Sequence, residues 1–126
     1  MVTGIEHTAI ASPHPMKLAQ WYVDHLDFTI NYRPPGSRTV FLKAHDGSMI
    51  EIVESNAPPR PQAMRDPGFR HLALAVSDFD AVLARLQSKS VTFLAGRESA
   101  GGNTLIFFSD CDGNILHLLH REHPLP

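Results

Sequence analysis

The sequence contains an internal repeat that limits the folds available to the chain. The pattern Gly-x-x-His-x-Ala begins at Gly4 and again at Gly68, 64 positions later. An Asp-Gly pair precedes Glu51, and the same pair precedes His117, 66 positions later. Self-similarity at a nearly constant offset indicates two copies of one supersecondary unit. Each copy offers two potential metal ligands at matching positions. The four candidates are His7, Glu51, His71 and His117.

The length of the chain fits one domain made from these two copies. With 126 residues the chain can bury a core, whereas a unit of about 60 residues would be marginal alone. We therefore expect a single domain over 1–126, with a first module at 1–57, a linker at 58–67 and a second module at 68–126. The linker is rich in proline, which favours an irregular connection.

The composition argues against several classes of partner. The chain has 19% charged residues and a formal net charge of −2, so it lacks the basic surface that nucleic acid or an anionic membrane attracts. No segment approaches the roughly 18 apolar residues of a membrane span, and the first residues do not resemble a secretory signal. We expect a cytoplasmic protein. Cys111 is the single cysteine, which excludes an internal disulfide and a thiolate cluster.

The first module reads as β-α-β-β-β. Pro13 and Pro15 end the first strand and can begin a helix, and Asp27 tolerates the left-handed conformation that ends one. Asp46-Gly47 is a strong hairpin signal. The expected elements are a strand at 5–12, a helix ending near 27, and strands at 28–32, 39–44 and 48–54.

The second module repeats this order. Ser77-x-x-Asp80 resembles a capping box at the start of a helix whose apolar residues then recur at helical spacing. The region 96–103 reads as a loop or the end of a hairpin, and Asp112-Gly113 as a turn. The expected strands lie at 71–76, 91–94, 104–108 and 115–119. The predicted fold class is α+β, with two βαβββ modules.

Strand alternation places the candidate ligands away from the helices. His7 and His71 share their strand faces with alanines, while the larger apolar residues point to the opposite faces. Glu51 lies between Ile50 and Ile52, where a carboxylate needs a metal or a charged partner such as arginine. His120 lies on the opposite face of its strand from His117, so it should not join the site.

Three imidazoles and one carboxylate suit a borderline divalent metal ion. Zn²⁺, Ni²⁺, Co²⁺, Mn²⁺ and Fe²⁺ accept such a set, whereas a Ca²⁺ site requires mostly oxygen ligands. An octahedral ion would keep two open positions for a substrate with neighbouring oxygen atoms and would act on it as a Lewis acid. Isomerase, lyase and dioxygenase chemistry all fit this arrangement.

At these residues the chain resembles the vicinal oxygen chelate superfamily, which includes glyoxalase I, extradiol dioxygenases and bleomycin-binding proteins. The resemblance covers nearly the whole chain. It rests on His7 in the first strand, the helix ending Leu26-Asp27-Phe28, the segment Met49-Ile50-Glu51-Ile52, the second opening Phe69-Arg70-His71-Leu72, and the run from Phe107 to Leu118. It implies paired βαβββ modules that form a cupped mixed sheet with helices on the outer face, usually in a homodimer, with the metal in the cup.

The ligand pattern is most similar to that of glyoxalase I. The resemblance implies that His7, Glu51, His71 and His117 bind the metal. In the family the base is usually a glutamate at the position of His117, so if the reaction abstracts a proton, Glu51 is the remaining carboxylate that can act as the catalytic base. The sequence departs from the family where His117 replaces the usual glutamate and where Asp27 and Cys111 replace a glycine and a proline. Our leading hypothesis is a metal-dependent isomerase or lyase acting on a small molecule. The alternatives are an Fe(II) dioxygenase and a non-catalytic small-molecule-binding or resistance protein.

Overall fold

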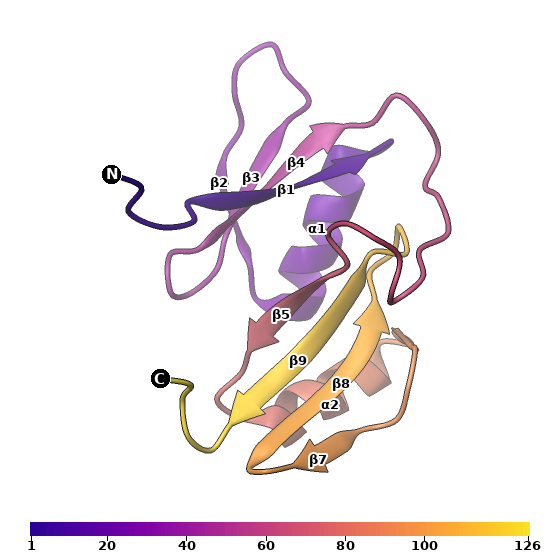
Figure 1. Ribbon diagram of the computed structural model, residues 1–126. Helices are drawn as coiled ribbons and strands as arrows, with labels where there is room; N and C mark the ends of the chain where they lie inside the picture. Colours follow the sequence, from indigo (N-terminus) through magenta and orange to yellow (C-terminus); the bar gives the residue numbers. More distant parts are fainter. The chain divides into compact units, whose positions relative to one another are not determined.

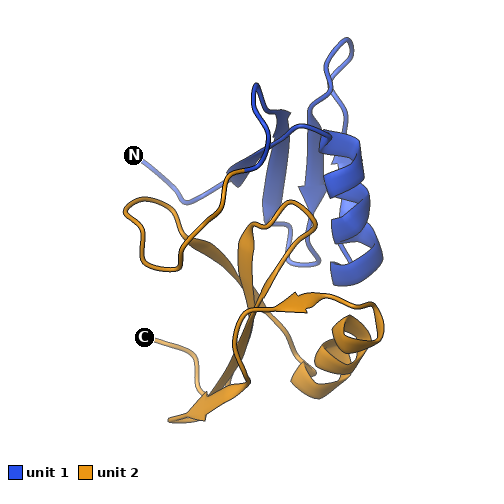
Figure 2. Ribbon diagram, turned by 90° about the vertical axis from the view of Figure 1, so that its right-hand side faces the viewer, with its two compact units in different colours: residues 1–59 blue, residues 60–126 orange.

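The computed structural model describes residues 1–126 and divides into two compact units, 1–59 and 60–126 (Figure 2). Each unit contains one α-helix and its own mixed sheet (Figure 1). The predicted α+β class and the repeated βαβββ order are therefore confirmed. Neither helix is long and apolar enough to cross a membrane.

The first unit has a four-stranded sheet with one helix on it. Its strand order is β1-β4-β3-β2; β1 runs parallel to β4 and the other neighbours are antiparallel. The helix α1 packs against this sheet (Figure 1). The elements are β1 (His7–Ser12), α1 (Pro15–Leu26), β2 (Thr29–Tyr32), β3 (Val40–Lys43) and β4 (Met49–Glu54).

The ends of α1 follow from its sequence. Pro15 occupies the first turn, where its missing N–H is not needed. Leu18, Ala19 and Tyr22 recur at helical spacing and are buried. Asp27 ends the helix with φ 59° and ψ 21°, the left-handed conformation expected at this position.

The period of two along the strands divides the first sheet into two faces. Ile50 and Ile52 of β4 are buried, as are Val40 and Leu42 of β3. These residues form the core with α1. Glu51, between the two isoleucines, consequently projects from the face opposite the helix.

The second unit has the same plan with one additional strand. Its strand order is β5-β9-β8-β6, β7 also pairs with β8, and β5 runs parallel to β9. The helix α2 contacts β9. The elements are β5 (His71–Ala75), α2 (Phe79–Ser88), β6 (Thr92–Phe93), β7 (Glu98–Ala100), β8 (Asn103–Ser109) and β9 (Ile115–Arg121).

Two local predictions for this unit need correction. The N-cap of α2 is Asp78, not Ser77, because the Asp78 carboxylate accepts a hydrogen bond from the Ala81 backbone N–H at 3.0 Å. The region predicted as a loop or hairpin end contains β7. Gly101 and Gly102 have φ values of 60° and 78°, which suit the tight turn that lets β7 pair with β8.

The two Asp-Gly turns have the same backbone hydrogen bonds. In the first unit, the N–H of Ala44 donates to the carbonyl of Ser48 at 2.8 Å. In the second, the N–H of Asp110 donates to the carbonyl of Asn114 at 3.1 Å. Gly47 and Gly113 both have positive φ, near 90°. The repeat therefore extends from the sequence to the geometry of the turns.

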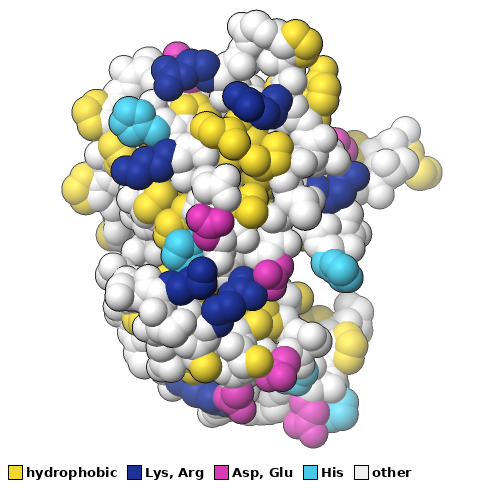
Figure 3. Space-filling model, turned by 180° about the vertical axis from the view of Figure 1, so that it is seen from behind, with side chains coloured by type: hydrophobic (Ala, Val, Ile, Leu, Met, Phe, Trp, Pro, Cys, Tyr) yellow, Lys and Arg dark blue, Asp and Glu magenta, His cyan; other side chains and the backbone are white.

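The charged side chains do not gather into one surface of a single sign on the face shown in Figure 3. Lys and Arg side chains occur there in several places, with Asp and Glu side chains among them. Ion pairs of the chain include Arg97 with Asp80, at 2.6 Å, and Arg38 with Glu54.

Candidate metal centre

The first unit brings together two of the predicted ligands, His7 and Glu51. In the parallel pairing of β1 with β4, His7 is the partner of Met49, and Ala9 is the partner of Glu51. The two side chains are thus diagonal neighbours on one face of the sheet. His7 Nε2 lies 3.9 Å from Glu51 Oε1. Within this unit the ion-pair partner of Glu51 is His7, not an arginine.

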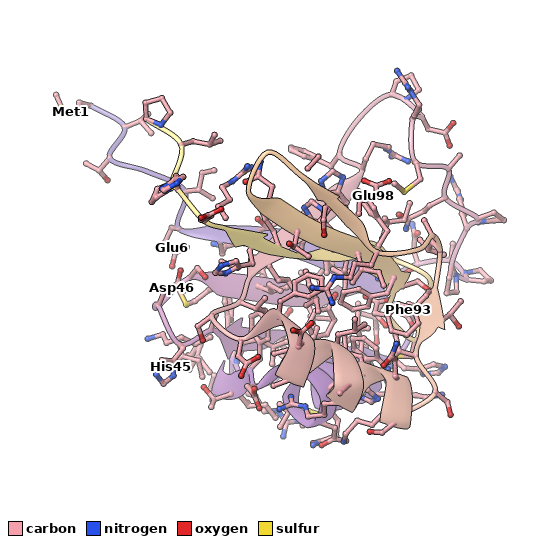
Figure 4. All side chains as sticks on the ribbon, turned by 90° about the horizontal axis from the view of Figure 1, so that it is seen from below. Met1, Glu6, His45, Asp46, Phe93 and Glu98 are labelled. Carbon is pink, nitrogen blue, oxygen red and sulfur yellow. The ribbon has the colours of Figure 1, made fainter.

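A residue that sequence reasoning missed, Glu6, contacts the other nitrogen of His7. The Glu6 carboxylate pairs with His7 Nδ1. This hydrogen bond raises the pKa of His7 above its ordinary value, and the negative charges of Glu6 and Glu51 add to the effect while desolvation opposes it. Figure 4 shows Glu6 at the same end of the first unit as His45 and Asp46 of the Asp-Gly turn. A carboxylate on one histidine nitrogen commonly orients the other toward a metal.

The second unit brings together the other two predicted ligands. The ring centroids of His71 and His117 are 4.6 Å apart, with the planes at 65°. His117 is only 8% exposed, and neither its Nδ1 nor its Nε2 has a hydrogen-bond partner. Burial lowers the pKa of His117, and the neighbouring charges of His71 and Arg121 lower it further. His117 is therefore a neutral imidazole with unsatisfied nitrogens at neutral pH.

A phenylalanine stands beside each pair, and neither was predicted. Phe41 is the cross-strand partner of Glu51 and meets the His7 ring edge-on, with centroids 5.8 Å apart. Phe107 is the cross-strand partner of His117 and stacks on its ring at 4.7 Å. It also meets the ring of His71 edge-on at 5.3 Å. The two phenylalanines are 66 positions apart, the offset of the Asp-Gly motif, and this spacing could have revealed them.

His120 is separated from the pair in the second unit. Its Nδ1 lies 3.2 Å from the backbone carbonyl of Val76. His117, three residues earlier in the same strand, lies on the opposite face. The structure thus agrees with the expectation that His120 stands apart.

The donor atoms of each pair fit a divalent ion. Imidazole nitrogen and carboxylate oxygen are the ligands that zinc and its neighbours in the first transition row accept. The unsatisfied nitrogens of His117 fit such a role, because a buried polar atom normally has a partner. Neither unit alone gathers three or more His, Cys, Asp or Glu side chains around a point that could hold a metal. Each unit supplies two of the four predicted ligands.

Comparisons with known proteins support the relationship that the sequence motifs suggest. The family model of the Glyoxalase/Bleomycin resistance protein/Dioxygenase superfamily matches residues 4–118. The chain is 32% identical over 123 residues to the uncharacterised protein YaeR of Escherichia coli (strain K12), covering 93% of this chain and 95% of that protein.

Solved structures show the same fold. A glyoxylase/bleomycin resistance protein/dioxygenase domain from Frankia sp. EAN1pec superposes with a TM-score of 0.80 at 18% identity, over 97% of this chain and 100% of that one. A lactoylglutathione lyase from Agrobacterium tumefaciens gives 0.70 at 18% identity, over 94% and 93% of the two chains. The family model matches most of the chain, and the fold and the repeated motifs agree with it. The chain therefore belongs to the glyoxalase/bleomycin resistance protein/dioxygenase superfamily, also called the vicinal oxygen chelate superfamily.

Proposed function

We propose that this protein is a metal-dependent enzyme of the glyoxalase I type, an isomerase or lyase acting on a small molecule with adjacent oxygen atoms. In this proposal one divalent ion is bound by all four predicted ligands, His7, Glu51, His71 and His117. The observation that carries it is the buried imidazole of His117, which lies against His71 with both ring nitrogens unsatisfied.

The energetics of His117 favour a metal ligand over a structural histidine. Leaving a buried polar group without a partner costs about 1–3 kcal/mol. A core histidine with only a packing role would normally recover this cost through a hydrogen bond, as His120 does with Val76. Binding a metal through one nitrogen would satisfy the imidazole in its neutral form, which is the form that burial favours in His117.

The proposed chemistry divides between the metal and Glu51. When bound, the ion would supply Lewis acidity to the oxygen atoms of the substrate. Glu51 would take a proton from a hydroxyl-bearing carbon next to a carbonyl and return it to the carbonyl carbon, while the hydroxyl proton passes to the former carbonyl oxygen, so the isomerisation balances without any other reactant. Its carboxylate is accessible for this, since Glu51 is only partly buried.

Glu6 and Phe107 would support the two histidines His7 and His117. Glu6 would hold the His7 ring through Nδ1 and leave Nε2 facing Glu51. Phe107, stacked on His117, would keep water from one face of that ring. We further propose that the protein is a homodimer in the cytoplasm. A chain with one cysteine needs no oxidising compartment, because it forms no internal disulfide.

The test is the metal content of protein purified without a chelator. We expect one divalent ion per chain among Zn, Ni, Co, Mn and Fe, measured by mass spectrometry of the intact protein and by elemental analysis. The His71→Ala variant should lose the ion, and His120→Ala should keep it. Protein that binds no divalent ion with micromolar or better affinity after reconstitution would rule the proposal out.

One feature supports a second candidate function, an Fe(II) dioxygenase. Two histidines and one carboxylate with open positions are typical of non-haem iron oxygenases. His71, His117 and Glu51 would supply such a set, leaving His7 outside it. Oxygen consumption that depends strictly on Fe²⁺ would favour this candidate, and turnover with Zn²⁺ or Ni²⁺ in the absence of oxygen would exclude it. A non-catalytic resistance protein would bind its ligand and show neither activity.

A further inference from the structure

A β-bulge changes the register of β2 at Asn31. Ile30 is paired with Leu42, but Tyr32 is paired with Phe41, so two steps along β2 match one step along β3. A regular ladder would have paired Tyr32 with Val40, which is fully buried on the α1 side of the sheet. The bulge therefore moves Tyr32 from the helix face to the face of Phe41. Bulges often redirect a side chain in this way beside a functional site.

The redirected tyrosine joins the face that carries the first ligand pair. The rings of Tyr32 and Phe41 are 6.2 Å apart at 38°. Phe41 in turn is the partner of Glu51 and meets the ring of His7. Asn31 also faces this side, since its Nδ2 lies 3.6 Å from Sδ of Met49, the cross-strand partner of His7. Both residues of the bulge thus lie on the sheet face that carries His7 and Glu51, and Phe41 lies between Tyr32 and His7.

Tyr32 is unusual in exposing a large ring on this face. It is 55% exposed, while Tyr22, the other tyrosine of the chain, is completely buried. Burying Tyr32 against the helix would have been the more stable use of its apolar surface. The bulge instead interrupts the regular ladder and places the ring next to Phe41, on the sheet face of His7 and Glu51. Such an arrangement suits binding of a ligand that has both a flat apolar part and polar atoms.

We propose that Tyr32 is a substrate-binding residue and that the substrate carries a planar aromatic or conjugated ring next to its adjacent oxygen atoms. This inference rests on the proposed function, because it takes the His7–Glu51 pair as the place where those oxygens are held. The ring of the substrate packs on Tyr32 and Phe41. The Tyr32 hydroxyl donates a hydrogen bond to a polar substituent of the substrate ring or accepts one from it. An aliphatic substrate gains little from this surface.

Two probes separate ring binding from binding by the oxygens. 4-Nitrocatechol has a ring and adjacent oxygens, whereas acetohydroxamate has adjacent oxygens without a ring. In zinc-loaded protein, Tyr32→Leu should weaken the binding of 4-nitrocatechol by about fivefold, which is the contribution of one aromatic contact. The same substitution should leave the affinity for acetohydroxamate unchanged. Tyr32→Phe should keep most of the affinity. Met64→Ala, a change at an exposed apolar residue outside both sheets, should change neither.

A third measurement does not need the metal. With ¹³C-labelled tyrosine, 2-naphthol added to metal-free protein should shift the ring signals of Tyr32 and leave those of the buried Tyr22 in place. Shifts at Tyr32 without any zinc binding would retain the ring site and reject the proposed metal centre. Zinc and acetohydroxamate binding with no effect of Tyr32→Leu on 4-nitrocatechol would retain the metal centre and overturn the role of Tyr32.

Deleting Asn31 tests the bulge itself. The deletion restores a regular register and should return Tyr32 to the helix side of the sheet. It should therefore lower the affinity for 4-nitrocatechol as much as Tyr32→Leu does. If the deletion variant does not fold, Tyr32→Leu still decides the question, because it changes one exposed side chain. A folded deletion variant with wild-type affinity for 4-nitrocatechol would contradict the proposal.

Discussion

Glu51 and His117 occupy equivalent positions in the two sheets. Each is the partner of an alanine in a parallel strand and of a phenylalanine in an antiparallel strand. The repeat thus preserves the surroundings and changes the side chain from carboxylate to imidazole. In the proposed mechanism this difference assigns proton transfer to the first unit, and the prediction for His117 depends on it.

Alanine at any one of the four proposed ligands should weaken metal binding about tenfold or more. The fold should survive, because these side chains lie opposite the helix-covered faces. Competition with a chromophoric chelator measures the affinity, and circular dichroism checks the fold. His120→Ala is the matched control, as its ring faces away from the pair in the second unit. Full metal occupancy in both Glu51→Ala and His71→Ala would show that the site lies elsewhere.

His117 should make the wild-type protein a poor catalyst of the glyoxalase I reaction itself, because the usual glutamate at this position is absent and Glu51 is the one carboxylate among the four proposed ligands. A coordinated imidazole has its lone pair committed to the metal and cannot accept a proton, whereas a carboxylate can leave the ion and act as a base. His117→Glu should therefore raise the isomerisation of the methylglyoxal–glutathione hemithioacetal, followed by absorbance. His117→Gln, which has no base, is the control. Strong wild-type turnover that His117→Glu abolishes would mean that the base has been misassigned.

The protein should be a homodimer. Within each sheet the edge strands leave backbone groups unpaired, and Phe69, just before β5, is almost fully exposed. A second chain can cover such surfaces. Sedimentation velocity at micromolar concentration should give a single species of twice the chain mass. A stable metal-loaded monomer under these conditions would disprove the prediction.

The two perturbed histidines should give opposite dependences of stability on pH in metal-free protein. The pKa of His117 is lowered in the folded protein. Below the pKa of an unfolded histidine, about 6.5, the unfolded state therefore binds more protons than the folded state. The free energy of unfolding consequently falls as the pH drops from about 6.5 to the pKa of the folded protein. His7 has a raised pKa, so its contribution is complete below about 6.5 and is lost as the pH rises through the folded value.

Urea unfolding between pH 5 and pH 8 in the presence of a chelator tests both signs. His117→Gln should lose less stability than the wild type on acidification. His7→Gln should lose less stability than the wild type on moving from acid to alkaline pH. Parallel curves for the wild type and both variants would contradict the assigned shifts.

Asp78→Ala should lower the free energy of unfolding by about 1 kcal/mol, since it removes the side-chain cap of α2. Ser77→Ala tests the alternative cap that the sequence suggested and should have little effect. Chemical denaturation of the two variants measures the difference. A larger loss in Ser77→Ala than in Asp78→Ala would favour the capping box predicted from the sequence.

The repeat allowed the fold to be predicted, because strand periodicity, the prolines before α1 and the two Asp-Gly turns are local signals. Local signals also placed the candidate ligands on strand faces away from the helices. Interactions across strands were not predictable in the same way. The stacking of Phe107 on His117 depends on the register of β8 with β9. The position of Tyr32 depends on a bulge, which no residue in the Thr29–Tyr32 segment signals.

The alternation along these strands also bears on how such a chain can evolve. Neighbouring residues of β4 serve different purposes: Ile50 and Ile52 belong to the core, and Glu51 lies on the opposite face near His7. Selection can therefore alter one set of positions while the other set stays unchanged. A duplicated module built in this way can acquire new chemistry by single substitutions, such as imidazole for carboxylate, without first having to find a new fold. Structures that share only 18% of their residues with this chain can accordingly keep its architecture.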